Sequence, residues 1–515
     1  MPDFSTRVAV ERLLQAERGG YRKPFGSAHS LGLVYPNTYH VGMSNLGFQI
    51  VHRLVNEFPD WLCERFFTDF DPPIALESLQ PPTSFDILAF SVSFELDYFH
   101  VLDFLVRSGI PPRAVDRGPE WPVIVCGGVC VDVNPHPICE FVDLVVNAEA
   151  EVALPDLLSL YREHRGDRRA FLNAASQLPG TFVTPPAANR YDVPGPHVEA
   201  GRIPVPDRVI APQLGKIPRC THIVTPNTEF SDMVLVELAR GCPYRCTFCF
   251  VGHNLNPYRT VPLEILKEWI AERRTQTERF GFVASAVASH PQIDELCAYC
   301  DELDVRVSYS SLRAEDVTLP MLRTLARSGA RSLTVAPEAG SFRLRRLLGK
   351  ARLPDERLFW VIENALRLGM PNLKLYFMVG IPTETEDDVL AIPELLRRLQ
   401  REFVAGSRPW GRIGSLSLNL SVFVPIPSTP LAKFEPLPVD TVRHHLAILE
   451  RQLRKQAQRG STPSRVRRKD WFIPDHPDED PDDEYARVER ILPPGYQERL
   501  RANLAAVLAG RQESS

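Results

Sequence analysis

Long apolar runs are absent from this 515-residue sequence, and their absence excludes two classes of protein. No stretch approaches the roughly 20 apolar residues that a membrane-spanning helix needs. The most apolar stretch, residues 85–106, is interrupted by four acidic side chains. The first twenty residues include acidic side chains and no apolar core, so a secretory signal peptide is not expected. We therefore expect a cytoplasmic protein with no membrane partner.

A large excess of charge of one sign is also missing. The 59 Lys and Arg residues nearly balance the 64 Asp and Glu residues, and the formal net charge is −5 at pH 7. This balance argues against a protein that binds a polyanion with its whole surface. A local basic run, RVRRK at 465–469, keeps nucleic acid open as a partner. An acidic run follows at 475–484, and such paired runs are more typical of a solvated surface.

Cysteine is present ten times, but not in a pattern that predicts disulfides. Thiols stay reduced in the cytoplasm, so these residues are better interpreted as metal ligands or core residues. Cys297 and Cys300 are three residues apart in a predicted helix, on the face that carries Ile293 and Leu296. That position favours core packing, with a second metal site as the alternative.

Alternating strands and helices predict an α/β fold with two domains. In the first, residues 1–165, strands are expected at 31–36, 85–93 and 122–128, and residues 141–151 are expected to hold a fourth strand and the start of a helix. This alternation is typical of a doubly wound, Rossmann-like parallel sheet, which binds ligands at the carboxyl ends of its strands. Residues 166–231 are expected to form a linker, because their most Pro-rich part shows little periodicity.

A second series of six strand–helix units predicts a (β/α)6 partial TIM barrel over residues 232–434. Its strands are expected at 233–239, 281–289, 306–312, 332–339, 373–380 and 416–425. In barrels of this kind the chemistry lies at the C-terminal ends of the strands. The tail, residues 435–515, is expected to be helical and partly mobile.

The clearest chemical signal is ARGCPYRCTFCFVG, which follows the first strand of the second series. Its thiols, Cys242, Cys246 and Cys249, have a C-x3-C-x2-C spacing that lets one loop wrap three corners of an iron–sulfur cubane. Three thiolates leave the fourth iron open, and an open iron can chelate the amino and carboxylate groups of a methionine moiety. Phe248 is placed to cover the cluster or an adenine.

Two other interpretations of the cysteine loop stay open. The three thiols and His253 could make a tetrahedral Cys3His zinc site, although zinc modules are usually small and self-contained. The cluster could also be purely structural or transfer electrons without catalysis.

The cysteine motif at the first barrel strand resembles the radical S-adenosylmethionine (SAM) superfamily. The resemblance implies a [4Fe–4S] cluster, bound SAM, and SAM contacts in the loops after the strands. The loop after strand two lacks the usual Gly-Gly-Glu, so backbone carbonyls near Ala288 and Ser289 would serve instead. Arg313 stands at the end of strand three. Glu338 resembles the ribose-contacting carboxylate, and Ser341 lines the same loop.

The front half resembles the cobalamin-binding-like domain of a radical SAM subgroup whose functions are mostly unassigned. Such domains normally carry Asp-x-His-x-x-Gly, with the His on cobalt. The comparable loop here, Asn37-Thr38-Tyr39-His40-Val41-Gly42, does not fit that spacing. A corrin could still be cradled without axial ligation by small residues at strand ends, which could equally be ordinary turns. These residues are Gly42, Ser91, Ser93, Gly127 and Gly128.

The function that the resemblance implies is reductive cleavage of SAM at the cluster to start radical chemistry. The cluster would take its electron from a low-potential donor such as flavodoxin or ferredoxin. Cobalamin-dependent methyl transfer to an unknown substrate is the leading specific hypothesis. The alternatives are a corrin-free radical SAM enzyme acting on RNA or another macromolecule, and a non-catalytic Fe–S or zinc protein. The sequence names no substrate and no catalytic side chain.

Overall fold

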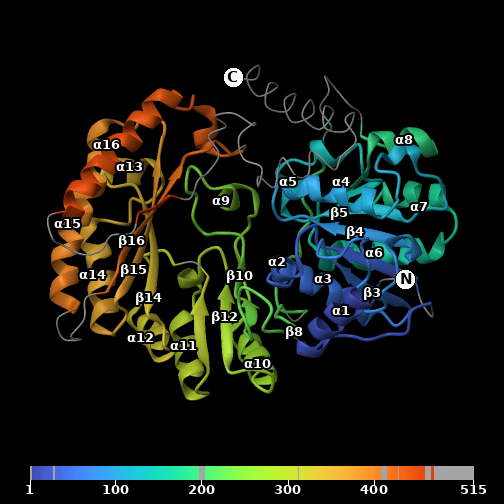
Figure 1. Ribbon diagram of the computed structural model, residues 1–515, viewed down its shortest axis with the longest axis horizontal. Coiled ribbons are helices and arrows are strands. Elements are labelled where there is room, and N and C mark those ends of the chain that lie inside the picture. Colours follow the sequence, from blue (N-terminus) through green and yellow to red (C-terminus); the bar gives the residue numbers. More distant parts are fainter. Residues whose placement is uncertain are drawn as a thin grey trace. The chain divides into compact units, whose positions relative to one another are not determined.

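The computed structural model describes residues 3–26, 29–196, 203, 205–217, 219–310, 312–407, 414–426, 428–458 and 466–468. These residues form two compact units. The N-terminal unit contains the described residues up to 212 and residues 219–232, and the C-terminal unit contains residues 213–217 and the described residues from 233 onward. The N-terminal unit is built around one mostly parallel sheet, and the C-terminal unit around two parallel sheets (Figure 1).

The N-terminal unit contains a six-stranded sheet in the order β3-β2-β4-β5-β6-β7. Its first five strands are parallel, and β7 runs antiparallel to β6. Numbered from β2, the order begins 2-1-3-4-5, the doubly wound arrangement expected from the sequence. The strands are β2 (His29–Val34), β3 (Trp61–Phe66), β4 (Ile87–Ser91), β5 (Val123–Gly127), β6 (Leu144–Val146) and β7 (Thr181–Val183).

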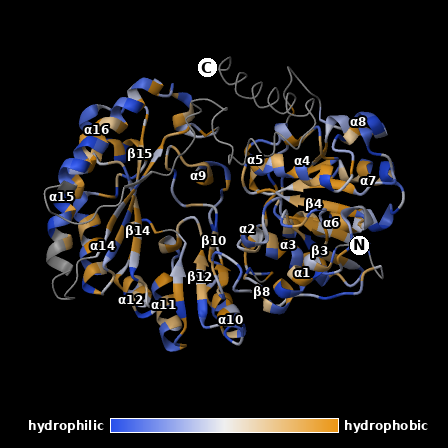
Figure 2. Cartoon of the chain, viewed as in Figure 1, coloured by the Kyte–Doolittle hydropathy of each residue, from blue (hydrophilic) through white to orange (hydrophobic). Residues whose placement is uncertain are grey.

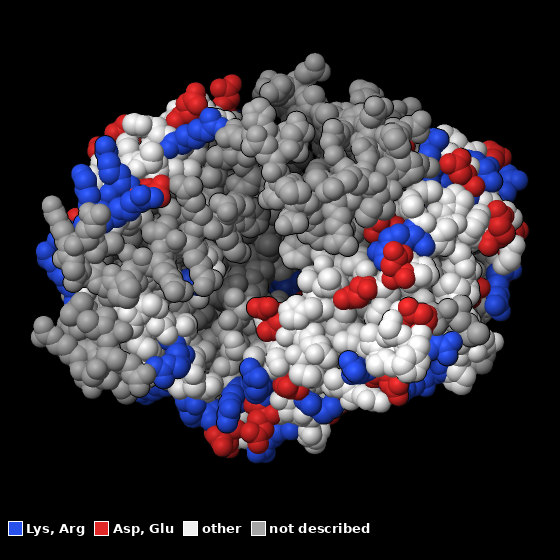
Figure 3. Space-filling model, in the orientation of Figure 1, with Lys and Arg blue, Asp and Glu red and all other residues white. Residues whose placement is uncertain are grey.

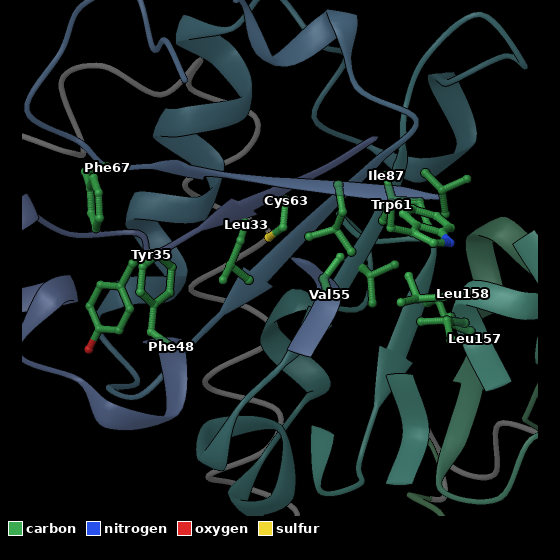
Figure 4. Packing of buried hydrophobic residues seen from close by; sticks show 14 of the residues in the cluster. Leu33, Tyr35, Phe48, Val55, Trp61, Cys63, Phe67, Ile87, Leu157 and Leu158 are labelled. Atoms are coloured by element: carbon green, nitrogen blue, oxygen red, sulfur yellow. The ribbon is translucent and has the colours of Figure 1, made fainter. Parts of the chain in front are cut away.

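Helices cover both faces of this sheet, and each strand divides its side chains between two apolar clusters. On β4, Ile87 belongs to one cluster and Leu88 to the other, because successive side chains point to opposite faces. Figure 4 shows part of the first cluster, with Phe48 beside Tyr35 and Leu157 beside Leu158. The first cluster includes α3 (Leu46–Glu57), α6 (Ala150–Glu163) and α7 (Arg168–Ala175), and the second includes α4 (Asp97–Arg107) and α5 (Val129–Val133).

Residues 166–231, expected as a linker, contain folded elements of the N-terminal unit instead. They form α7, β7, α8 (Pro185–Tyr191) and β8 (Ile223–Val224), and β8 pairs antiparallel with β1 (Arg18–Gly19). The buried Phe171, Leu172 and Ala175 anchor α7 in the first apolar cluster. Strands of two or three residues carry almost no periodic signal, so only tertiary pairing reveals them.

The C-terminal unit contains all six expected strands, arranged as a three-stranded and a four-stranded parallel sheet. The first has the order β13-β12-β9, and the second has the order β14-β15-β16-β17. The strands are β9 (Val234–Glu237), β12 (Arg279–Val283), β13 (Arg306–Tyr309), β14 (Ser332–Glu338), β15 (Asn372–Val379) and β16 (Leu416–Val422). The α/β barrel-type fold expected from the sequence is therefore present.

Helices line the outer side of these strands and bury their apolar faces against them (Figures 1 and 2). Three successive helices bury Leu358, Leu395 and Leu449 against the second sheet. The outer helices are α10 (Leu263–Arg273), α11 (Ile293–Glu302), α12 (Leu319–Arg327), α14 (Asp355–Arg367), α15 (Glu386–Ser407) and α16 (Val439–Gln458).

Part of the basic run at 465–469 is a strand. Residues Val466–Arg468 form β17, which pairs parallel with β16, whereas residues 465 and 469 are outside the described part of the chain. The acidic run at 475–484 is also outside it. Basic and acidic side chains alternate over the described part of the face in Figure 3. Within the described residues, no helix is both long and apolar enough to cross a membrane.

Candidate functional site

The cysteine loop is a closed excursion from the first barrel strand. After β9 the chain leaves through β10 (Ala239–Arg240) and returns through β11 (Arg259–Thr260), and these two short strands pair antiparallel. The pairing pins the base of the loop, and α9 (Phe250–Asn254) follows the third cysteine. Thr247 ties the middle of the loop to the end of α13 (Phe342–Leu347), because its hydroxyl donates to the Leu347 carbonyl at 2.8 Å.

Two glycines allow the loop to fold this tightly. Gly241 has φ +79°, and a Cβ at this position would lie 2.7 Å from the carbonyl oxygens of Leu255 and Pro257. A Cβ on Gly252 would lie 2.3 Å from the Tyr244 carbonyl oxygen. Both approaches are against backbone, so no larger residue fits without shifting the loop.

The three thiols lie in one loop, with Cys246 buried and the other two partly exposed. Burial raises the pKa of the Cys242 thiol, and the neighbouring Cys246 and Cys249 thiols raise it further. Three thiols on one loop, with no fourth cysteine in that loop, are the donor set that a site-differentiated [4Fe–4S] cluster needs.

The histidine of the zinc alternative already has a partner in the structure. A ring nitrogen of His253 is engaged 3.0 Å from the Cys246 carbonyl oxygen.

Phe248 packs against an apolar cluster at and beyond the ends of β14, β15 and β16. The cluster includes Ala339, Met378, Ile381 and Phe423. The sequence placed Phe248 over the cluster or the adenine. Its contacts in the structure are those of an anchor for the cysteine loop.

The loops after β12 and β13 meet the cysteine loop through hydroxyl and carboxylate groups. The Tyr244 hydroxyl donates to Asp316, and the Ser289 hydroxyl lies 3.2 Å from the same carboxylate and 3.3 Å from the Tyr244 oxygen. Ser289 and the buried Ala288 belong to a single 3-10 turn at 287–289. The structure thus brings Ser289 against the cysteine loop, with Ala288 in the same turn. Arg313 is also here, with its guanidinium against Cys246.

Glu338, the expected ribose contact, ends β14 in a left-handed backbone conformation with φ +67°. Such a conformation is costly for a residue with a side chain and is common at functional sites. Lys350 holds the carboxylate, because its ammonium donates to Glu338 Oε1 at 2.8 Å and also to the Ala336 carbonyl. Lys350 is only 4% exposed, so its charge needs these partners.

Ser341 makes two local hydrogen bonds that the sequence did not predict. Its hydroxyl caps α13 by accepting from the Leu344 N–H at 3.2 Å, and donates to Asp388 at 2.6 Å. Arg343 from the same loop also pairs with Asp388. The structure therefore shows Ser341 tying the loop after β14 to α15, with its hydroxyl engaged at both lone pair and proton.

The candidate corrin residues of the N-terminal unit lie at or near the carboxyl ends of the strands, in different surroundings. Gly42 is buried in α2 (Tyr39–Met43), where a Cβ would lie 2.5 Å from the Phe67 ring, so it serves packing. Ser91 and Gly127 are the last residues of β4 and β5. Gly128 has φ +106° and touches the Val92 backbone, and Ser93 accepts from the Asn45 amide at 3.0 Å.

His40 is not directed at a pocket in this unit. Its side chain is 55% exposed and its Nε2 lies 3.6 Å from Glu229. Cys297 and Cys300, by contrast, are fully buried in α11, and burial raises the pKa of Cys297 to about 11. Protonated, buried thiols are poor metal ligands, so the core interpretation of this second pair is supported.

Two family models match the chain, one in each unit. The model described as the N-terminal part of radical SAM proteins matches residues 47–184, and the model described as the radical SAM superfamily matches residues 236–396. The chain belongs to the radical SAM superfamily. It is therefore a radical SAM enzyme, and the cofactors of its superfamily are a [4Fe–4S] cluster and SAM.

Relatives of this radical SAM enzyme differ in how much of the chain they share. An uncharacterised protein of Methanocaldococcus jannaschii is 27% identical over 412 residues, 78% of each chain. The ribosomal protein uS12 methylthiotransferase RimO of Thermodesulfovibrio yellowstonii is 24% identical over 32% of this chain and 41% of its own length. The tRNA-2-methylthio-N(6)-dimethylallyladenosine synthase of Pseudothermotoga lettingae is 22% identical over 41% of this chain and 48% of its own length.

Among solved structures, the radical SAM methyltransferase TsrM from Kitasatospora setae has a similar fold. With tryptophan and a SAM analogue bound, it aligns with a TM-score of 0.52 and 14% identity, over 78% of this chain and 75% of TsrM. A second TsrM structure contains cobalamin and a [4Fe–4S] cluster and aligns with a TM-score of 0.51. The match shows a common fold that extends over both units.

Sequence reasoning missed several residues of the radical SAM site. Tyr244 and Asp316 join three loops through their hydrogen bond. Glu315 pairs with Arg313, and Lys350 pairs with Glu338. Asp388 accepts a hydrogen bond from Ser341 in the loop after β14. Only Tyr244 had a signal, since it lies inside the cysteine motif. The others meet their partners across gaps in sequence or are ordinary surface residue types, so no local pattern identifies them.

Proposed function

We propose that this enzyme transfers methyl groups with the help of cobalamin, and that Cys242, Cys246 and Cys249 hold its [4Fe–4S] cluster. The strand order of the N-terminal unit supports the cobalamin part of this proposal. Its order reverses between β2 and β4, and ligands of doubly wound sheets bind in the crevice outside the carboxyl ends at such a switch point.

The side chains at this edge suit a corrin. Phe94 and Leu96 follow β4 and are 56% and 52% exposed, and Val129 follows β5 and is 38% exposed. Large apolar side chains gathered at a ligand-binding edge are typical of a recognition surface. Val129 immediately follows Gly127 and Gly128, two of the small residues proposed to cradle the corrin.

Two histidines of this unit, His40 and His100, already have partners. His40 is paired with Glu229, and His100 lies 2.9 Å from the Pro36 carbonyl and 3.1 Å from Asp97. The apolar edge therefore supports a corrin held by its periphery and flat face. TsrM, which shares the fold over both units, was solved with cobalamin bound.

When bound, the cluster supplies an electron for cleavage of the SAM sulfonium, and the corrin supplies a methyl group. The chain's own residues position these groups. The pinned cysteine loop presents three thiols, Lys350 orients the Glu338 carboxylate, and Tyr244 and Asp316 lock the loops after β12 and β13. The substrate stays unnamed.

Corrin binding by the full chain tests the proposal. Anaerobically purified protein is incubated with hydroxocobalamin, passed through a desalting column, and examined for retained corrin absorbance. We expect stoichiometric retention by the wild type, and a large loss in Phe94→Asp combined with Leu96→Asp. Phe4→Asp is the matched control, because Phe4 is 83% exposed in the same unit on α1 (Phe4–Ala16), away from the strand ends.

Two results would overturn parts of this proposal separately. A wild-type protein that retains no corrin, yet cleaves SAM with dithionite, is a corrin-free radical SAM enzyme. A protein with stoichiometric zinc and no labile sulfide has no cluster on the three cysteines.

A further inference from the structure

Arg313 is the one charged side chain that the described structure shows bonded to a sulfur of the cysteine motif. Its Nη1 donates to Cys246 Sγ at 2.9 Å. Both groups are shielded from water, since the Arg313 side chain is 12% exposed and Cys246 is 6% exposed. Electrostatic interactions in such surroundings are screened far less than on the surface.

Neighbouring groups hold the guanidinium against the sulfur. Its Nη2 donates to Glu315 Oε1 at 2.6 Å, and the Glu315 side chain is 1% exposed. The guanidinium carbon lies 3.9 Å from the centre of the Tyr244 ring, the distance of a stacked cation–π contact. A planar guanidinium fixed on one edge and one face leaves Nη1 directed at Cys246.

We propose that Arg313 is a positioning residue that sets the reduction potential of the [4Fe–4S] cluster. This inference rests on the proposed function, because it needs Cys246 to ligate the cluster. Reduction adds one negative charge to the cluster, so a nearby cation and an N–H···S hydrogen bond stabilise the reduced form more than the oxidised form. Arg313 therefore makes the cluster easier to reduce by a low-potential donor.

A purely structural role predicts something different. Tyr244 already ties the cysteine loop to Asp316 independently of Arg313. If Arg313 only supported the loop, its loss would lower the amount of cluster without moving the potential of the clusters that remain. The potential is thus the readout that separates the two roles.

The experiment is a potentiometric titration of the full-length, reconstituted protein, without SAM, followed by EPR of the reduced cluster. Arg313→Gln is compared with wild type and with Arg352→Gln. Arg352 is a matched control, because it lies 3.4 Å from Asp316 at the edge of the same site but is 69% exposed. We expect Arg313→Gln to disfavour reduction about tenfold, a shift of about 59 mV to more negative potential for one electron.

Arg352→Gln should shift the potential much less, because water and salt screen an exposed charge. Equal potentials in Arg313→Gln and Arg352→Gln, with iron and sulfide counts intact, would overturn the inference while leaving the proposed cluster ligands in place. If Arg313→Gln holds no cluster, Arg313→Lys decides. A flexible ammonium cannot keep the N–H on the sulfur, so its potential should fall below wild type, and a wild-type value would overturn the inference.

Discussion

Cys246 differs from the other cysteines of the motif in its surroundings. It is buried, it accepts the Arg313 hydrogen bond, and its backbone carbonyl engages His253. Cys297 and Cys300, although also in a C-x2-C pattern, are enclosed by α11 and its apolar neighbours. The same residue type therefore serves two purposes, and the charged Arg313 contact of Cys246 distinguishes the motif from the buried pair on α11.

Replacement of Cys246 by alanine should remove the thiolate-to-iron absorbance and all SAM cleavage, because a cubane with two protein thiolates is not retained. Cys300→Ala is the matched control and should keep both, at a cost in stability typical of a buried truncation. Anaerobic spectra and a 5′-deoxyadenosine assay check this. Loss of the cluster in Cys300→Ala, with Cys246→Ala unaffected, would contradict the ligand assignment.

Lys350 should matter for SAM binding although its contact is with protein. Lys350→Met removes the ammonium that holds Glu338, so we expect the Kd for SAM to rise about tenfold, or ~1.4 kcal/mol. Isothermal titration of the reconstituted protein measures it, with iron content unchanged. Lys433→Met, at an exposed position in the same unit, is the control, and an equal Kd in both variants would show that Lys350 does not orient Glu338.

At the scale of elements, one buried carboxylate holds several segments of the N-terminal unit together. Asp143, immediately before β6, accepts from Arg117 at 2.9 Å, from Arg168 on α7 and from the Ile124 N–H on β5. Its side chain is fully buried. Two guanidinium groups around one carboxylate stay in the interior only while that carboxylate is charged and present.

Asp143→Ala should lower the free energy of unfolding by about 3–5 kcal/mol, because it leaves two buried cations without their shared partner. Chemical denaturation of the N-terminal unit's transition in the full chain measures the loss. Asp156→Ala, on the exposed side of α6, is the control and should change it by less than about 0.5 kcal/mol. A similar small effect in both variants would contradict the proposed network.

Several secondary-structure elements differ from those that the sequence predicts. Strands of five to eight apolar residues, such as β4 and β15, match their expected positions because alternation and composition identify them. The short β7 and β17 were not expected, and neither was β3, whose sequence WLCERF contains two charges. Arg65 on β3 is buried because Glu17 and Glu77 pair with it, at 2.7 and 2.6 Å. A charge neutralised by distant partners cannot be distinguished from a surface charge by local pattern.

At the scale of the whole molecule, the pH dependence of stability should include a buried histidine pair. His52 on α3 is fully buried, with its Nδ1 3.0 Å from His222 Nε2. Burial lowers the pKa of His52 well below its usual value, and the nearby Arg65 lowers it further. His52 is thus neutral in the folded protein, whereas in the unfolded chain it takes up a proton below about pH 6.5.

Since the unfolded state binds more protons, stability should fall as the pH decreases below about 6.5 and keep falling toward the folded-state pKa. His52→Gln should flatten this dependence, and His40→Gln, at an exposed position, should not. Thermal unfolding of the full chain at pH 7.5 and 5.5 tests it. A parallel fall in wild type and His52→Gln would exclude His52 as the source.

The sequence alone determined the fold class of both units, the six barrel strands and the three cysteines of the motif. These features depend on residues close together in the chain: a two-residue alternation, a glycine before a turn, and thiols three and four positions apart. Local spacing records them directly.

Only the tertiary structure decided which residues surround those cysteines and what they do. Arg313 is 67 residues from Cys246 and Tyr244 is 72 residues from Asp316, so their contacts follow from how the strands pair. The extent of the N-terminal unit was decided in the same way, by the burial of α7 and the pairing of β8 with β1. Parallel strands bring distant loops to one edge, and only the order of the strands determines which loops meet there.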